Sequence, residues 1–149
     1  MVGGKNIQVV PSSGLLTVQA SSIPITDITS NYTTIGCTVG GASAVLIPGE
    51  IALFPVDFSG VIENWTVLSD LDNSSCVVQV YKSTYSGYPT MSAITGTDKP
   101  IISNAIKAQS SALTGWTTAV TSGDVFKFIL ESVTTAQTLT VTLRIRKTG

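Results

Sequence analysis

The stretch TLTVTLRIRK, residues 138–147, decides the fold class because its apolar and polar residues alternate strictly. On an extended chain, one face of this stretch receives only Leu139, Val141, Leu143 and Ile145. The opposite face receives threonines and arginines. A period of two is typical of a strand with one face buried and the other in solvent. We therefore predict a half-buried β-strand, with its basic residues on the solvated face.

The segment just upstream, residues 125–131, alternates in the same way. Its apolar face carries Phe126, Phe128 and Leu130, while Lys127 and Glu131 lie on the opposite face. Residues 132–137, between the two alternating segments, are polar enough to turn. Together the two segments predict an antiparallel hairpin.

Shorter segments closer to the N-terminus also have strand character and are separated by clusters of Gly, Pro, Asn, Asp and Ser. We predict strands at residues 15–20, 43–47, 51–56, 61–69 and 75–82. Residues 102–112 contain Ala, Lys and Gln, which favour a helical turn, so we expect one short helix or an irregular crossover there.

Many short strands separated by turn residues predict an all-β fold. We expect an antiparallel β-sandwich, jelly-roll-like, in which two sheets pack across one core. Aromatic side chains are expected to fill much of that core, namely Phe54, Trp65, Tyr81, Trp116, Phe126 and Phe128.

Charged residues are scarce: 17 of 149 residues are Asp, Glu, Lys or Arg, whereas 43% are hydrophobic and the mean hydropathy is +0.38. About a quarter of the residues of a soluble protein are usually charged, so this surface is expected to be coated by Ser and Thr or covered by neighbours. The chain has no histidine and no Ser-x-x-Lys spacing, which removes the usual catalytic arrangements. We expect no enzymatic activity and no cofactor.

The net charge of −1 and the scattered basic residues argue against a nucleic-acid partner. No apolar segment approaches the ~18 residues of a membrane span, and residues 1–5 do not begin a secretion signal. Synthesis and accumulation in a cytoplasm are therefore expected. Cys37 and Cys76 could form one disulfide, but two reduced core thiols are the favoured interpretation.

Several carboxylates deserve comparison with known site patterns. Asp57 and Glu63 border Trp65, which would suit a sugar-cleaving acid pair, but acids in turns or on outward strand faces are the favoured interpretation. Residues 70–73 resemble the opening of a calcium loop, but Ser75 and Tyr81 stand where that loop needs glycine and glutamate. An Asx turn is the better account, and no metal site is predicted.

The first fifty residues differ in composition from the rest, with only Lys5, Asp27 and Glu50 charged. We predict that residues 1–35 form an extended N-terminal arm and that residues 36–149 form the β-sandwich domain. Apolar residues of such an arm stay exposed unless another surface covers them. The arm is therefore expected to dock on other subunits through Ile7, Val9, Val10, Leu15, Leu16 and Val18.

Carbohydrate binding is a second kind of interaction that the sequence raises. Tyr85 and Tyr88 lie in a predicted loop at residues 81–91, and Trp116 follows another loop. Such rings can stack on sugars. Alternatively, they lie over the edge of the core with their hydroxyl groups in solvent.

Residues 60–147 carry an ordered series of short motifs: Gly60-Val-Ile, Trp65, Asp70, Val77-Val-Gln-Val-Tyr-Lys82, Tyr88-Pro89, Ile94-Thr-Gly96, Lys99-Pro100, Leu113-Thr-Gly-Trp116, Gly123-Asp-Val125 and Phe128. This series resembles a β-sandwich domain of tailed-bacteriophage virion proteins, found in head decoration proteins and tail-fibre tips. The chain departs from that family at Gln79, often an Asp, and at residues 73–75, often a turn with glycine. These departures weaken the expectation of an acid-dependent ligand site.

The resemblance implies a role in a virus particle, often as a trimer. The first expectation is a capsid decoration, or cement, protein: a homotrimer on the major capsid protein, at the capsid surface of a virion made in the host bacterial cytoplasm. The alternative is a receptor- or carbohydrate-binding module of a tail fibre. A fibre tip usually ends a longer polypeptide, whereas this sequence begins with Met1, so the first is preferred.

Overall fold

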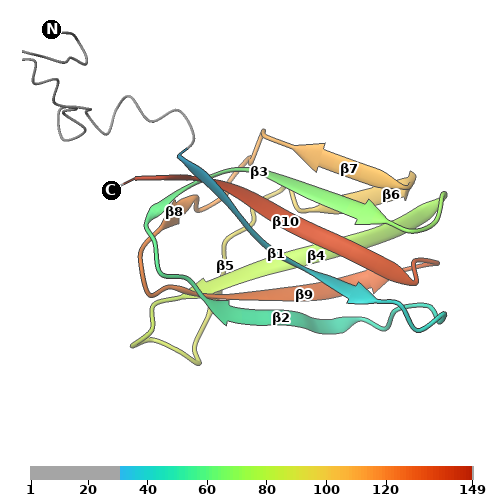
Figure 1. Cartoon of the computed structure of the whole chain (residues 1–149), viewed down its shortest axis with the longest axis horizontal. Helices are drawn as coiled ribbons and strands as arrows, with labels where there is room; N and C mark the ends of the chain where they lie inside the picture. Colours follow the sequence, from blue (N-terminus) through green and yellow to red (C-terminus); the bar gives the residue numbers. More distant parts are fainter. Residues whose placement is uncertain (1–30, 149) are drawn as a thin grey trace, which may run out of the picture. The chain divides into compact units, whose positions relative to one another are not determined.

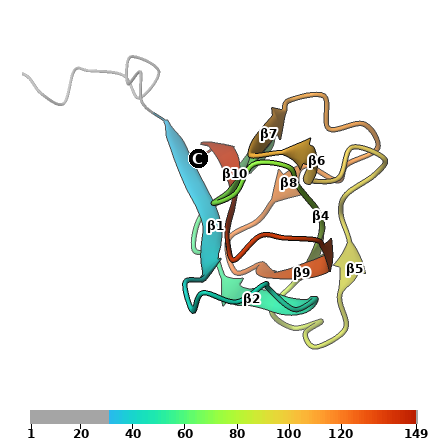
Figure 2. The same ribbon diagram turned by 90° about the vertical axis from the view of Figure 1, so that its right-hand side faces the viewer.

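The computed structural model describes residues 31–148, which contain ten strands and no helix. In chain order the strands are β1 (Tyr32–Gly40), β2 (Gly49–Pro55), β3 (Gly60–Ser69), β4 (Ser74–Ser83), β5 (Ser92–Ala93), β6 (Ile101–Ala105), β7 (Lys107–Ser110), β8 (Ala119–Val120), β9 (Val125–Val133) and β10 (Thr138–Lys147). They form two antiparallel sheets that pack against each other (Figures 1 and 2). The predicted antiparallel β-sandwich is confirmed.

Both sheets combine strands from distant parts of the chain. The first sheet has the order β1-β10-β3-β7, with β8 also paired to β3. The second has the order β2-β9-β4-β5, with β6 also paired to β4. The first and last strands of the described part are therefore neighbours, with Tyr32 opposite Arg146 and Gly40 opposite Thr138.

The core lies between the sheets and is built by the predicted alternation. All four apolar residues of β10 are buried, and from the other sheet Phe126, Phe128 and Leu130 of β9 are buried as well. Trp65 is also buried. Phe54, Tyr81 and Trp116, the other predicted core aromatics, are only half-buried.

The predicted hairpin of residues 125–147 is wrong, because β9 and β10 belong to different sheets. β9 pairs with β2 and β4, whereas β10 pairs with β1 and β3. The alternation shows that each strand buries one face, but it does not identify the neighbouring strand. Here the two apolar faces meet across the core, and the connection between them includes Ala136, which is completely buried.

Two further predictions of secondary structure are wrong. Residues 43–47 form a loop, in which Ser43 has a φ of +59°, outside the extended region. The short helix expected in residues 102–112 does not form. These residues make most of β6 and β7, which pair with β4 and β3, so the segment crosses from one sheet to the other. Helix propensity is a weak preference, and here the two sheet ladders override it.

Strand β1 was not predicted, and its first residues, 32–35, fall in the segment assigned to the arm. The compact unit begins at Tyr32. Two glycines weaken the strand signal of β1. Gly36 is needed for close approach to β10, because a Cβ there would lie 2.1 Å from the Val141 carbonyl oxygen. The predicted strand at residues 15–20 and all of the predicted arm before residue 31 lie outside the described residues.

Candidate binding surfaces

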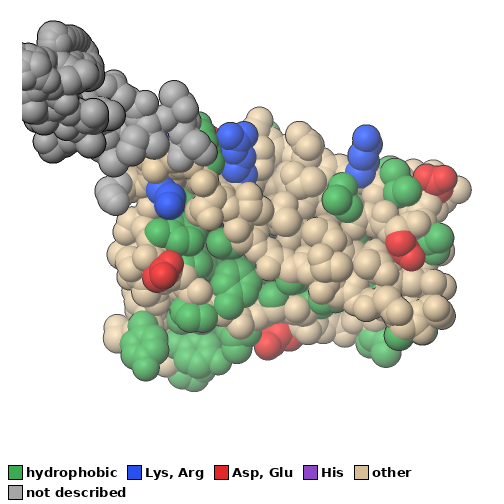
Figure 3. All heavy atoms as spheres, viewed as in Figure 1, with side chains coloured by type: hydrophobic (Ala, Val, Ile, Leu, Met, Phe, Trp, Pro, Cys, Tyr) green, Lys and Arg blue, Asp and Glu red, His purple; other side chains and the backbone are tan. Residues whose placement is uncertain are grey.

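The loop between β4 and β5 presents two tyrosines to solvent. Tyr85 is 79% exposed and Tyr88 is 43% exposed. Figure 3 shows hydrophobic side chains gathered at the lower left, where this loop lies in Figure 1. The backbone N–H groups of Gly87 and Tyr88 both donate to the Thr84 carbonyl oxygen at 3.1 Å, and Thr90 N–H donates to Gly87 at 3.0 Å. These bonds give the loop a defined shape, which lowers the entropy lost when a ligand binds.

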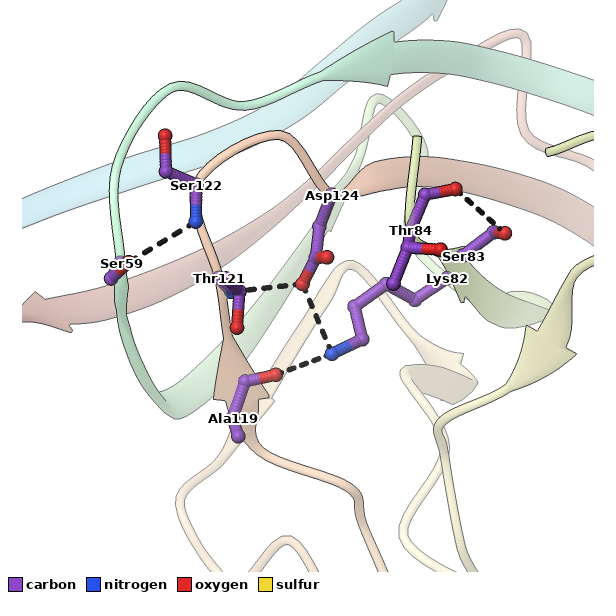
Figure 4. A network of polar contacts seen from close by, with 8 residues as sticks. All are labelled: Ser59, Lys82, Ser83, Thr84, Ala119, Thr121, Ser122 and Asp124. Carbon is purple, nitrogen blue, oxygen red and sulfur yellow. Dashed lines mark hydrogen bonds and ion pairs between the residues drawn. The ribbon is translucent and has the colours of Figure 1, made fainter. Parts of the chain in front are cut away.

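An ion pair between the half-buried Lys82 and the buried Asp124 holds the base of this tyrosine loop (Figure 4). Lys82 Nζ lies 3.2 Å from Asp124 Oδ2 and also donates to the Ala119 carbonyl oxygen at 2.6 Å. The same carboxylate oxygen accepts a hydrogen bond from Thr121 N–H at 2.8 Å. Because Asp124 is only 3% exposed, these partners are needed to offset the cost of burying its charge. The network ties the end of β4 to the β8–β9 connection and so fixes where the tyrosine loop starts.

Trp116, the third residue predicted to contact a glycan, is part of a different network. Its Nε1 donates to the Asp98 carbonyl oxygen at 2.9 Å, and Trp65 Nε1 donates to the same oxygen at 3.0 Å. The half-buried Trp116 ring packs on the core. No hydrogen bond or ring contact joins it to Tyr85 or Tyr88 within residues 31–148. The structure therefore brings the two tyrosines together on one loop and gives the tryptophan internal partners.

A hollow of about 350 Å³ lies on the first sheet, across β3 and β7. It is lined by Thr66, Leu68, Lys107, Ala108 and Gln109. Leu68 is exposed on the outer face of the sheet, because consecutive strand residues point to opposite faces and its neighbour Val67 is completely buried in the core. Sequence reasoning missed this surface, and the signal that could have found it is the apolar pair at 67–68, which breaks the alternation of β3.

The two carboxylates considered for sugar cleavage do not form an acid pair beside Trp65. Glu63 binds Arg146 at 2.8 Å, and Asp57 is exposed. Trp65 is only 3% exposed, so its ring cannot stack on a sugar beside Glu63. In the described part of the chain, no group of three or more His, Cys, Asp or Glu residues could hold a metal ion.

Asp70 lies in the β3–β4 turn, where its carboxylate stabilises the connection between β9 and β10. Its Oδ1 accepts hydrogen bonds from the backbone N–H groups of Thr138 and Gln137, both at 3.0 Å. The bond from Thr138 is the main cause that lowers the pKa of Asp70, because it favours the charged form. Residues 70–73, which resemble the opening of a calcium loop, therefore form the β3–β4 turn. Through Asp70, this turn is bonded to the connection between β9 and β10.

The two cysteines are unpaired, as predicted. Cys76 is buried in β4, and Cys37 is half-buried in β1. Burial raises the pKa of both thiols, because the charged thiolate is poorly solvated there. Neither thiol has the lowered pKa of a reactive cysteine.

The residues expected to dock the arm, Ile7, Val9, Val10, Leu15, Leu16 and Val18, lie outside the described residues. Their contacts remain a prediction. Residues 31–148 include no helix long and apolar enough to cross a membrane.

Comparison with known proteins adds no relative, since no family model, curated protein or solved structure matches the chain. The function is therefore inferred from the chain's own residues.

Proposed function

We propose that this chain is a capsid decoration (cement) protein of a tailed bacteriophage, which binds the outer surface of the head and stabilises it. The observation that supports this proposal is a surface with exposed apolar side chains and few charges. Ten large hydrophobic residues are exposed within residues 31–148, while the whole chain has only 17 charged residues. Few charges on a surface with many exposed apolar side chains favour association with other proteins.

The order of the strands supports a virion protein of jelly-roll type. The first and last strands are neighbours, and each sheet alternates strands from the two halves of the described part. Two sheets connected in this way are typical of jelly rolls, a fold used in viral capsids. The resemblance of residues 60–147 to virion β-sandwich domains supports the same proposal.

Decoration would stabilise a head through many weak contacts acting together. Each apolar contact with the major capsid protein contributes roughly 25 cal/mol per Å² of buried area. Multivalent attachment, as the proposed homotrimer, would raise the overall affinity above that of one subunit. The arm would add contacts through Ile7, Val9, Val10, Leu15, Leu16 and Val18, by pairing with strands of the capsid or of a neighbouring copy.

Binding to phage heads tests this proposal. The full chain and a variant lacking residues 1–20 are mixed with heads that lack this protein, prepared from the phage whose genome encodes it. We expect the full chain to sediment with the heads and the shortened variant to remain in the supernatant.

A matched pair of full-length variants shows whether binding depends on the apolar side chains of the arm or only on the length of the chain. One replaces the six apolar arm residues by threonine, and the other replaces the polar residues Gln8, Ser12, Ser13 and Gln19 by alanine. Only the first should lose binding, while circular dichroism stays unchanged for both. Retained binding by the shortened variant would contradict the proposed role of the arm.

A second function, glycan recognition by a tail-fibre module, is favoured by the exposed tyrosines on an ordered loop. The variant Tyr88→Ala tests it on a glycan array, with Tyr32→Ala as an exposed tyrosine outside the loop. Binding by the unchanged protein that is lost only in Tyr88→Ala would favour this function over decoration. An array without signal would leave decoration as the better proposal.

A further inference from the structure

The outer edge of β1 differs from the other sheet edges of the described part. Natural proteins protect edge strands by keeping them short or by adding charges, prolines and bulges. Strand β2 contains Glu50 and Pro55 and has a register shift after Glu50. Strands β5 and β8 have two residues each, β6 has a register shift against β4, and β7 has four residues that begin with Lys107.

Strand β1 has none of these protections. It runs for nine residues, YTTIGCTVG, without a charge or a proline, and it pairs with β10 without a register shift. It ends the order of its sheet, as Figure 2 also shows. No hydrogen bond joins its outer edge to another residue within 31–148. A long, neutral edge of this kind favours the addition of another strand.

The core also reaches solvent at this edge. Ile35, Cys37 and Val39 of β1 point inward and pack against the core, but each remains partly exposed. Their neighbours on β10, such as Val141 and Leu143, are completely covered. A strand added beside β1 would cover the remaining apolar surface of these residues.

The sequence of β1 is complementary to itself. When two antiparallel copies are centred on Gly36, each residue faces the one at the same distance on the other side of the centre. On the outer face, Tyr32 then lies opposite Gly40 of the second copy, and Thr34 opposite Thr38. On the inner face, Thr33 lies opposite Val39 and Ile35 opposite Cys37. Thr–Thr pairs, apolar pairs and an aromatic ring across a glycine are all favourable cross-strand neighbours.

We propose that the edge of β1 binds β1 of a second copy of this chain, antiparallel and about a two-fold axis at Gly36. Such an interface is isologous, because both copies contribute the same strand. It joins two five-stranded sheets into one continuous sheet. The proposal is independent of the proposed decoration function, since it concerns association of the protein without any head.

Two double variants of the full chain test both the surface and the register. In T34K/T38K, the two-fold register places lysine opposite lysine twice, and like charges at opposite positions destabilise strand pairing. In T34K/T38E, the same register places lysine opposite glutamate twice. Both variants change the same two exposed positions and both lose the 2.8 Å hydrogen bond between the Thr38 and Thr140 hydroxyls. They therefore differ only in the residue at position 38, where the charge changes sign.

Sedimentation equilibrium and hydrogen exchange provide the measurements. We expect the unchanged protein to associate in pairs through β1, as a dimer, or as a hexamer in which two of the proposed trimers pair through this edge. T34K/T38K should associate about tenfold or more weakly than T34K/T38E. Amides of β1 should exchange faster in T34K/T38K than in T34K/T38E.

Three outcomes would overturn the proposal. The first is equal association of the two variants. The second is an unchanged protein that is monomeric with a fast-exchanging β1. The third is a monomer with a protected β1, which would show that residues 1–30 of the same chain occupy the edge.

Discussion

Asp98 joins several structural elements near the edge of the core, through its carboxylate and its backbone carbonyl. Its Oδ2 accepts hydrogen bonds from Ser110 Oγ at 2.6 Å and Leu113 N–H at 2.8 Å, and its carbonyl oxygen accepts from the Trp65 and Trp116 indoles. Hydrogen bonds to a charged acceptor stabilise more than neutral ones. This carboxylate therefore fixes the loops after β5 and β7.

We expect Asp98→Ala to lower the free energy of unfolding by about 2 kcal/mol, because a hydroxyl and a backbone N–H lose their acceptor. Urea denaturation followed by tryptophan fluorescence measures this loss. The control is Asp57→Ala, which removes an exposed carboxylate that is not part of this network. Equal stability of the two variants would contradict the role of Asp98.

The two thiols should react at different rates in the folded protein. Cys76 is buried and Cys37 only partly so, while burial raises the pKa of both. Because the thiolate is the reactive form, we expect slow labelling by iodoacetamide at pH 7, with Cys37 ahead of Cys76. Mass spectrometry of C37S and C76S, in native buffer and in urea, assigns each rate. Fast native labelling of the thiol that remains in C37S would contradict the burial of Cys76.

At the level of single strands, the sequence predicted which face of a strand is buried, but not which strands are its neighbours in the sheet. The alternation of residues 138–147 predicted β10 with the correct bounds, because a period of two directly reports a strand with one buried face. The same pattern could not place β9 in the opposite sheet, since partner choice depends on contacts far along the chain. The signal of β1 was weakened by Gly36 and Gly40, which the close approach to β10 requires.

Asp70 couples the β3–β4 turn to the β9–β10 connection in a pH-dependent way. Its pKa is lowered in the folded state, so the folded protein holds this proton less tightly than the unfolded chain. The resulting stability is present above about pH 4, the usual range of an unfolded Asp, and is lost as the pH falls through the lower pKa of the folded state.

We expect Asp70→Asn to be less stable than the unchanged protein at neutral pH, with a difference that shrinks below about pH 4. Urea unfolding between pH 2 and 7 measures this trend. The neighbouring variant Asp72→Asn, in which an exposed carboxylate outside these bonds is removed, should follow the unchanged protein. A difference that stays constant with pH would rule out a contribution from the charge of Asp70.

On the scale of the whole molecule, the sequence predicted the fold class better than the site. Many short strands with turn signals are enough to indicate a sandwich, because the pattern repeats along the chain. A binding surface depends on a few side chains whose exposure is decided by packing. Trp116 illustrates the difficulty, since its sequence context fits a sugar platform as well as its observed bond to Asp98.

The compact unit Tyr32–Gly149 has a core that includes both sheets, so it should fold without the preceding residues. We expect a chain of residues 31–149 to unfold cooperatively, with a free energy of unfolding within about 1 kcal/mol of the full chain. In both backgrounds Phe128→Ala should cost about 3–5 kcal/mol, because Phe128 is completely buried between the sheets. Urea denaturation of the full chain, of residues 31–149 and of the Phe128→Ala variant of each gives the four free energies of unfolding. A shortened chain that is unfolded, or in which Phe128→Ala has little effect, would show that residues 1–30 contribute to the core.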